Sequence, residues 1–254
     1  MPVLNRIAEF HAEATEWRRD IHQNPELLFE VHRTAALVEE KLKEFGVDEI
    51  ATGIGRTGVV GVIKGRKTDS GKVIGRRADM DALPSNEVRE LPYKSQTPGL
   101  MHACGHDGHT TMLLAAAKYL AETRNFDGTA VVIFQPAEVG GGGGDEMVKD
   151  GMMDRWGIQE VYGMHNAPNI PTGAFAMRTG PLLAAADTFD VRIEGVGGHA
   201  ARPHDCVDPV PIAAQLISAF QTIVARNTDP LESLVISTTQ MQASDAHYII
   251  PQVV

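Results

Sequence analysis

The chain has little cysteine, no long apolar run and no surplus of basic residues, and each of these absences excludes a class of protein. Two cysteines, Cys104 and Cys206, cannot form a disulfide framework. The apolar runs are far shorter than the roughly 20 residues that a membrane helix needs. A formal charge of −10 opposes nucleic-acid binding, because phosphate recognition needs an excess of lysine and arginine. We therefore expect neither a nucleic-acid partner nor a membrane partner.

The N-terminus has no feature of an export signal. Residues 1–20 mix charged and apolar side chains and contain neither an apolar core segment nor a small-residue cleavage site. We therefore expect a cytoplasmic protein. With 43% hydrophobic residues the chain can bury one sizeable core or two smaller ones, and 25 glycines with 14 prolines suit a loop-rich α/β protein.

Segments with helical and strand-like patterns alternate through the first two thirds of the chain. Such alternation predicts an α/β fold with a mostly parallel, twisted sheet covered by helices. The predicted helices span residues 3–22, 34–45, 110–122 and 146–151, and the predicted strands span residues 58–64, 72–78, 129–135 and 160–164.

A different pattern begins near Asp187. Residues 187–195 alternate apolar and polar side chains, as in a strand with one solvent-facing side. Residues 209–225 form one amphipathic helical pattern, residues 234–241 a second alternating strand, and residues 248–251 a short strand-like segment. These elements predict a small, partial α+β domain.

A dense group of metal-ligating residue types occupies residues 102–109, which contain three histidines, one cysteine and one aspartate. Such side chains resist burial unless they are paired or bound to a metal ion. Cys104 and His106 are separated by one residue, so both can reach the same ion or neighbouring ions. The alternative is a helix start at which these side chains only cap the helix and face solvent.

Other polar residues follow the predicted strands, whose carboxyl ends should converge at one edge of the sheet. Glu138 precedes the glycine run at 140–144, which would let backbone approach a substrate, so we interpret it as a general base acting on metal-bound water. The alternatives are an exposed loop carboxylate and a flexible linker. His165 is a candidate ligand or a buried core histidine. Asp79 and Asp81 either orient a ligand histidine or form a strand-end turn.

Five motifs together resemble the amidohydrolase branch of the M20 metallopeptidase family, which includes hippurate hydrolases, N-acyl-amino-acid amidohydrolases and plant auxin-conjugate hydrolases. The motifs are Arg77–Pro84, Met101–His109, Phe134–Glu138, Gly163–Asn166 and Gly197–His204. The resemblance implies hydrolysis of the amide bond of a small N-acyl amino acid, such as hippurate, to a carboxylic acid and an amino acid.

The resemblance also implies a role for each candidate site residue. Cys104, His106 and His165 would bind two divalent ions, which would be manganese, zinc, cobalt or nickel. Glu138 would take a proton from the bridging water, and His199 would stabilise the tetrahedral oxyanion. The residues expected to support this site are Asp79, Asp81, Asp107 and His109.

The family architecture implies two domains. A zinc-exopeptidase-like catalytic domain would span residues 1–184, without its C-terminal segment, and a partial lid domain would span residues 185–254. The lid would mediate formation of a homodimer.

Several residues depart from the family pattern. Val139 stands where the family has a ligand glutamate, and the last ligand histidine of the family lies in a segment beyond Val254, so one ion instead of two is an open alternative. Arg76 replaces a leucine in an expected buried strand, Ala167 replaces a tryptophan, and Tyr248 replaces a substrate-contacting asparagine. The remaining alternatives are a homologue that binds metal or an acyl amino acid without turnover, a dipeptidase or aminoacylase, and a dimerising remnant.

Overall fold

The computed structural model describes residues 4–244 and 246–254, which leaves the expected helix start at residue 3 outside the described part. The chain forms two compact units, Met1–Ala176 and Met177–Val254. The domain boundary that we expect between residues 184 and 185 stays a prediction.

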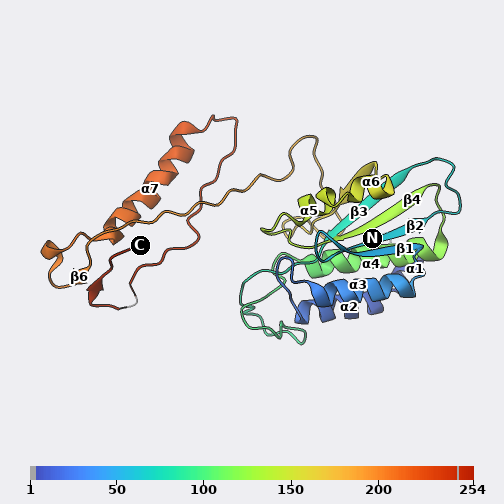
Figure 1. Ribbon diagram of the computed structural model, residues 1–254, viewed down its shortest axis with the longest axis horizontal. Helices are drawn as coiled ribbons and strands as arrows, with labels where there is room; N and C mark the ends of the chain where they lie inside the picture. The colour runs from blue at the N-terminus through green and yellow to red at the C-terminus, as the bar shows by residue number, and fades with distance from the viewer. Residues whose placement is uncertain (1–3, 245) are drawn as a thin grey trace. The chain divides into compact units, whose positions relative to one another are not determined.

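The first unit is built on a five-stranded sheet with the order β1-β2-β4-β3-β5 (Figure 1). The pairs β3·β4 and β3·β5 are parallel, whereas β1·β2 and β2·β4 are antiparallel, so the sheet is mixed. The strand β1 was not predicted, because its glycine and polar residues give no clear alternation. The strands are β1 (Glu49–Ile54), β2 (Gly58–Lys64), β3 (Val73–Asp79), β4 (Thr129–Gln135) and β5 (Glu160–Gly163).

Helices cover both faces of this sheet, which confirms the predicted α/β fold class (Figure 1). The helices on one face are α1 (Asn5–Glu9), α2 (His11–Gln23), α3 (His32–Glu44) and α4 (His106–Thr123). The helices on the other face are α5 (Gly143–Lys149) and α6 (Met152–Trp156). The single helix predicted over residues 3–22 is wrong, because the chain turns at the buried Phe10, whose N–H bonds to Ile7 O instead of continuing the helix.

The two central strands bury side chains on both faces. In β4, Val132 and Phe134 pack into the core beneath α2, α3 and α4, whereas Val131 and Ile133 pack with α5 and α6. This is the alternation of a strand that has a hydrophobic layer on each side. It explains why β2 and β4 appear in the sequence as continuous apolar runs, and the predicted bounds of both strands are confirmed.

The second unit contains one helix and a short ladder. Asp208 caps the helix α7 (Pro209–Asn227), since its Oδ1 accepts from Val210 N at 3.0 Å. The ladder pairs β6 (Gly198–His199) with β7 (Ile249–Ile250), and the 3₁₀ turn η1 (Pro203–Asp205) lies between β6 and α7.

The strands predicted over residues 187–195 and 234–241 are wrong. Within the first segment only its end is paired, through backbone hydrogen bonds from Ile193 to Val254 and from Gly195 to Gln252. Alternation favours a strand only where another strand is available to pair with it.

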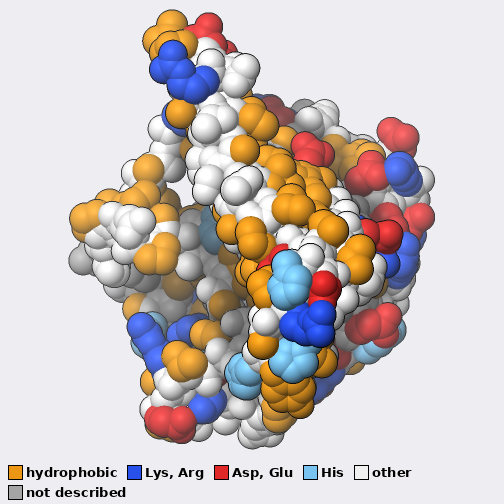
Figure 2. Space-filling model, turned by 90° about the vertical axis from the view of Figure 1, so that its left-hand side faces the viewer, with side chains coloured by type: hydrophobic (Ala, Val, Ile, Leu, Met, Phe, Trp, Pro, Cys, Tyr) orange, Lys and Arg blue, Asp and Glu red, His pale blue; other side chains and the backbone are white. Residues whose placement is uncertain are grey.

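Few large side chains of this unit are buried, and many apolar side chains, such as Phe189, Leu234 and Val235, are exposed. Figure 2 shows apolar side chains spread over the face of the molecule that it presents. Among the helices of the described residues, none is long and apolar enough to cross a membrane.

Candidate metal centre

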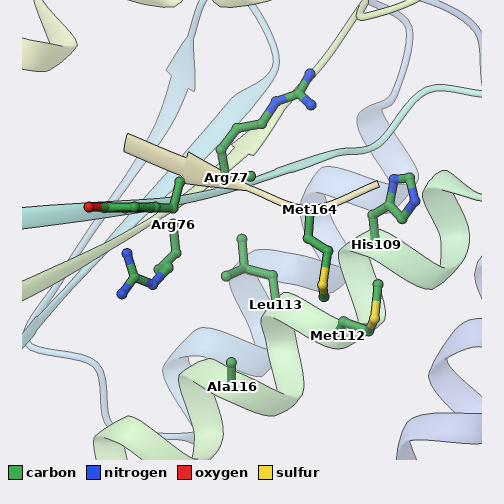
Figure 3. Close-up of a pocket in the computed structure, with 9 residues that line it drawn as sticks. Arg76, Arg77, His109, Met112, Leu113, Ala116 and Met164 are labelled. Carbon is green, nitrogen blue, oxygen red and sulfur yellow. The ribbon is translucent and has the colours of Figure 1, made fainter. Parts of the chain in front are cut away.

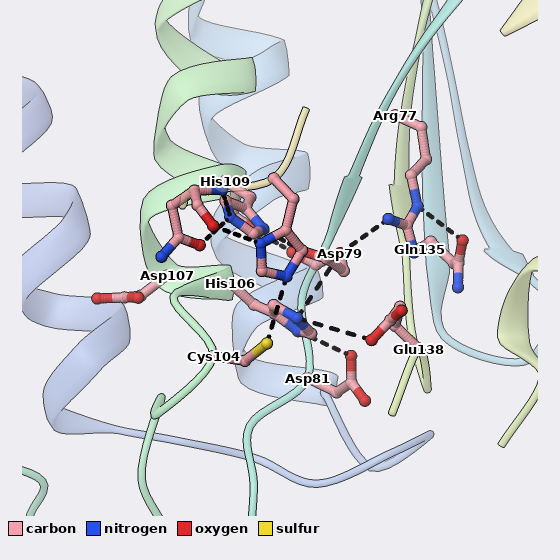
Figure 4. Close-up of polar contacts among 12 residues, drawn as sticks. Arg77, Asp79, Asp81, Cys104, His106, Asp107, His109, Gln135 and Glu138 are labelled. Carbon is pink, nitrogen blue, oxygen red and sulfur yellow. Dashed lines mark hydrogen bonds and ion pairs between the residues drawn. The ribbon is translucent and has the colours of Figure 1, made fainter. Parts of the chain in front are cut away.

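The expected site residues other than His199 come from four places in the first unit. Asp79 ends β3, Glu138 follows β4, His165 follows β5, and Cys104 precedes α4, which begins at His106. The structure brings Cys104, His106 and His165 together, with one donor atom from each lying within 4.8 Å of the other two. Figure 4 shows the surrounding carboxylates and their contacts.

The early start of α4 places two histidines on its buried face. The predicted helix began at Thr110, but Gly105 has a φ of +93°, which a glycine adopts without strain, and the helix begins directly after it. His106 and His109 are therefore three residues apart on one face of the first turn. Both side chains are almost fully buried.

The ring of His106 is oriented by Asp81. Its Nδ1 lies 3.3 Å from Asp81 Oδ1, and the other oxygen of Asp81 accepts from Val139 N at 3.1 Å. Because the carboxylate can only accept, Nδ1 carries the proton. The buried Nε2 has no hydrogen-bond partner and lies 3.7 Å from both Glu138 Oε2 and Asp79 Oδ2. An unpaired buried nitrogen among carboxylates is the arrangement that a cation requires.

The ring of His165 has the same protonation pattern. Its Nδ1 donates to Asn166 O at 2.7 Å, so Nε2 keeps its lone pair and lies 3.3 Å from Cys104 Sγ. The Nε2 of His165 therefore faces the cysteine sulfur, and one ring nitrogen of His106 lies within 4.8 Å of both atoms. Imidazole nitrogen and thiolate sulfur are the donors that zinc and similar ions prefer.

A second group of donors, formed by Asp79, His106 and His109, also lies within 4.8 Å. In this group His109 is already engaged, because its Nδ1 bonds to Asp79 Oδ1 at 2.7 Å and its Nε2 faces Asn166. Burial alone would raise the pKa of Asp79, but the hydrogen bond from His109 and the charges of His106 and Arg77 bring it down to about 2. The group formed by Cys104, His106 and His165 is therefore the better ligand set.

The negative charge at the site also favours a cation. Burial raises the pKa of the Cys104 thiol, and the charges of Glu138, Asp79 and Asp81 raise it further. The pKa of His106 is raised as well, because its hydrogen bond to Asp81 and the nearby carboxylates outweigh burial. A divalent cation would offset this excess of carboxylates, so the residues present fit a metal ion.

Glu138 lies beside this donor group, directly after a hydrogen-bonded turn. The preceding Ala137 is fully buried with a φ of +50°, which is unusual for a residue other than glycine, and its N–H donates to Leu28 O at 3.1 Å. Gly143 N donates to Ala137 O at 3.1 Å. The side chain of Glu138 is 35% exposed, so it can meet a substrate. The side chain of the neighbouring Val139 has no atom that could bind a metal ion.

Asp107 and His199 are not part of this donor group. Asp107 is buried and points away from the group (Figure 4). Its Oδ2 lies 3.0 Å from Arg18 Nε and 2.9 Å from His22 Nδ1. His199 belongs to the second unit, where its Nδ1 accepts from Ala201 N at 3.1 Å. The roles that we expect for these two residues stay predictions.

Sequence reasoning missed a buried network behind the metal-binding loop. His22 bonds to Asp107 through Nδ1 and lies 3.2 Å from Glu87 Oε1 through Nε2. The nearby His102 is buried without a partner for either nitrogen, and burial lowers its pKa to about 4. The sole signal in the sequence was a histidine on the inner face of a predicted helix. Asn166 lies within the Gly163–Asn166 motif, but nothing in the sequence indicates its contact with His109.

Arg76 is not buried, contrary to expectation. Its side chain is exposed, and its guanidinium lies over the ring of Tyr162, 4.8 Å from the ring centroid. The charge therefore needs no buried partner. A groove of about 200 Å³ lies between β5 and α4, and its lining includes Met112 and Met164. Figure 3 shows Arg76 among the residues that line this groove.

Comparisons with known proteins show the family to which this chain belongs. The model of peptidase family M20/M25/M40 matches residues 75–254. The chain is 47% identical to a hippurate hydrolase of Campylobacter jejuni over 253 residues, which cover 100% of this chain and 65% of the relative. It is 42% identical to an N-acyl-L-amino acid amidohydrolase of Geobacillus stearothermophilus over 96% of this chain and 65% of that protein.

A solved structure shows the same relationship. The YXEP protein of Bacillus subtilis, described as a dinuclear metal-binding peptidase from the M20 family, matches with a TM-score of 0.69 and 36% identity over 97% of this chain and 62% of that one. The chain thus spans about 65% of the length of the two curated relatives. The family match and the identity over almost the whole chain together show that this chain belongs to peptidase family M20/M25/M40.

Proposed function

We propose that this chain forms the catalytic part of a metal-dependent amidohydrolase that cleaves the amide bond of N-acyl amino acids. The observation that carries the proposal is the proximity of three potential metal ligands. Cys104 Sγ and one ring nitrogen each of His106 and His165 lie within 4.8 Å of one another, and a carboxylate oxygen of Glu138 lies 3.7 Å from His106 Nε2. The substrate class is supported by the names of the relatives, a hippurate hydrolase and an N-acyl-L-amino acid amidohydrolase.

A divalent cation held by Cys104, His106 and His165 would polarise the amide carbonyl and lower the pKa of a water molecule. Asp81 keeps the proton of His106 on Nδ1, and Asn166 O does the same for His165, so both Nε2 atoms remain available. The buried carboxylate of Asp79 adds negative charge behind the ligands.

Glu138 serves as the general base in this proposal. Its carboxylate accepts the proton of the attacking water and passes it to the leaving amine nitrogen, which departs as the free amino acid. The turn at Ala137 fixes the direction of the side chain, and its partial exposure gives it access to a substrate.

The donor set among the described residues supports one ion more strongly than two. Val139 carries no donor atom at the position where the resemblance expects a second glutamate, and both ring nitrogens of His109 already have partners. We therefore propose a single firmly held ion on this chain. Thiolate sulfur and imidazole nitrogen suit zinc, cobalt and nickel, and the carboxylates around them would also accept manganese.

The test is amino-acid release from N-benzoylglycine and from a panel of N-acyl amino acids and dipeptides, using the purified chain with added zinc or manganese. We expect turnover that a chelator abolishes and that Glu138→Gln abolishes without loss of metal binding. Glu40→Gln, which alters an exposed carboxylate in α3, is the control. Metal binding without turnover, in both the wild type and Val139→Glu, would instead support a binding protein.

A further inference from the structure

We propose that His109 is a positioning residue that fixes the orientation of His165 through Asn166, and is not itself a metal ligand. The inference rests on the proposed function, because it assigns a role within the same site. It concerns a link between two elements, the first turn of α4 and the loop that follows β5.

Both nitrogens of His109 are committed to protein partners. The residue is 3% exposed, and its Nδ1 lies 2.7 Å from Asp79 Oδ1. Its Nε2 lies 3.0 Å from the backbone N of Asn166 and 2.6 Å from Asn166 Oδ1. Whether Nε2 accepts from the backbone N–H or donates to the side-chain oxygen, neither nitrogen is left for a metal ion. Asp79 therefore anchors the ring, and the ring holds Asn166.

Asn166 connects this anchor to His165. Its backbone N–H faces His109, and its backbone oxygen accepts from His165 Nδ1 at 2.7 Å. That second bond requires the proton of His165 to be on Nδ1, which leaves Nε2 to face Cys104 Sγ at 3.3 Å. Displacing Asn166 would thus remove the acceptor that sets the tautomer of His165.

The side chain of Asn166 also lies against the metal-binding loop. It lies against Gly105, where an added Cβ would come within 2.7 Å of Asn166 Oδ1. Gly105 itself stands between the two candidate ligands Cys104 and His106. Asn166 therefore contacts both His109 and the metal-binding loop, and it connects the loop after β5 to them.

His165 has little else to orient it. The residue and all four residues of β5 are exposed, so close packing does not restrict its ring. The ring of His109 lies edge-on to it, with the centroids 4.6 Å apart and the planes at 68°. In an exposed loop, where packing is weak, such hydrogen bonds and ring contacts largely determine the rotamer of a side chain.

The first test needs no metal. Long-range proton–nitrogen NMR spectra of the imidazole rings in the metal-free full chain report which nitrogen of each histidine is protonated, and a His165→Ala variant assigns the signals. We expect Nδ1 protonation of His165 in the wild type and in the control His32→Ala, which removes an exposed histidine of α3. In His109→Ala we expect His165 to shift to the mixed tautomers of a free imidazole. An unchanged His165 signal in His109→Ala would overturn the proposal.

The second test uses the cobalt ion alone. Absorption bands of the cobalt-loaded chain report thiolate and imidazole ligation, and titration gives the affinity. We expect His109→Ala to weaken cobalt binding about 10- to 100-fold and His32→Ala to leave it unchanged. Because His109 acts through His165, His109→Ala should weaken binding no further in a His165→Ala background. A further loss in the double variant would make His109 a ligand and overturn the proposal.

The two tests separate this inference from the proposed function. If the wild type binds no cobalt but His165 loses its tautomer in His109→Ala, the metal site is wrong and the positioning of His165 is right. If cobalt binds through Cys104, as loss of its charge-transfer band in Cys104→Ser would show, and both His109→Ala results are negative, the metal site stands and the inference fails.

Discussion

Replacing Asp81 by asparagine tests whether the protonation of His106 is set by the protein. The two oxygens of Asp81 each accept from a donor, His106 Nδ1–H at 3.3 Å and Val139 N–H at 3.1 Å. An asparagine of the same shape has one acceptor oxygen and one donor NH₂ group, so it can satisfy only one of these donors. Asp81 is 1% exposed, which leaves the side chain no room to turn towards solvent.

The two possible orientations have different consequences. If the NH₂ group faces His106, the ring must accept through Nδ1 and place its proton on Nε2, the atom that would bind the metal. If it faces Val139, a backbone donor is left unpaired, at a cost of about 1–3 kcal/mol of folding free energy. The first orientation is expected to weaken metal binding about 10- to 100-fold, or about 1.4–2.7 kcal/mol.

The assay is zinc affinity, measured by competition with a chromophoric chelator, together with urea unfolding of the metal-free chain. Asp69→Asn, which changes an exposed aspartate on the loop between β2 and β3, is the control and should alter neither quantity. An Asp81→Asn variant with wild-type zinc affinity and wild-type stability would refute the reasoning, since one of the two must change.

Three further predictions follow from contacts elsewhere in the first unit. Gly143→Ala would place a Cβ 1.8 Å from Pro136 O and displace the turn that carries Glu138, so we expect a loss of about 1–3 kcal/mol in urea unfolding and reduced turnover, whereas Gly140→Ala, with nothing within 4 Å, should be neutral. Phe134→Ala removes a fully buried ring and should cost about 3–5 kcal/mol, against almost nothing for the exposed Phe175→Ala in the same unfolding assay. Hydrogen bonds to Asp107 and Glu87 raise the pKa of His22 above 6.5 despite burial, so its contribution is fully present below pH 6.5 and is lost as the pH rises through the raised pKa. The wild type should therefore lose more unfolding free energy than His22→Gln over that pH range; parallel curves for the two proteins would contradict this.

Local sequence patterns predicted the central strands and failed where pairing decides the structure. The runs that became β2 and β4 are apolar throughout because both of their faces are buried, so their bounds could be predicted. Residues 187–195 alternate just as clearly but form no strand, since only the end of this segment has a hydrogen-bonded neighbour. Alternation reports which side chains could share a face and gives no information about the partner.

At the candidate site, too, the sequence predicted which residues approach one another but not the contacts that depend on their partners in space. The rule that ligands bind at the carboxyl ends of strands predicted that His165, Glu138 and Asp79 would approach the cysteine and histidine motif. It could not predict which nitrogen of each histidine is free, because that depends on Asp81 and on the backbone of Asn166. Nor could it predict the bond between His22 and Asp107, which lie 85 residues apart in the sequence.

The edge position of β5 has a consequence for how the first unit opens. This strand has four residues, all exposed, and within the described part of the chain it pairs with β3 alone. Short edge strands with few buried contacts are where a fold opens locally, on the hydrogen-exchange timescale, without global unfolding. A metal ion bound by both His165 and Cys104 would link the segment that follows β5 to the segment that precedes α4. The backbone amides of β5 would then exchange more slowly with solvent, so occupancy of the site could be followed at a strand that contributes no ligand of its own.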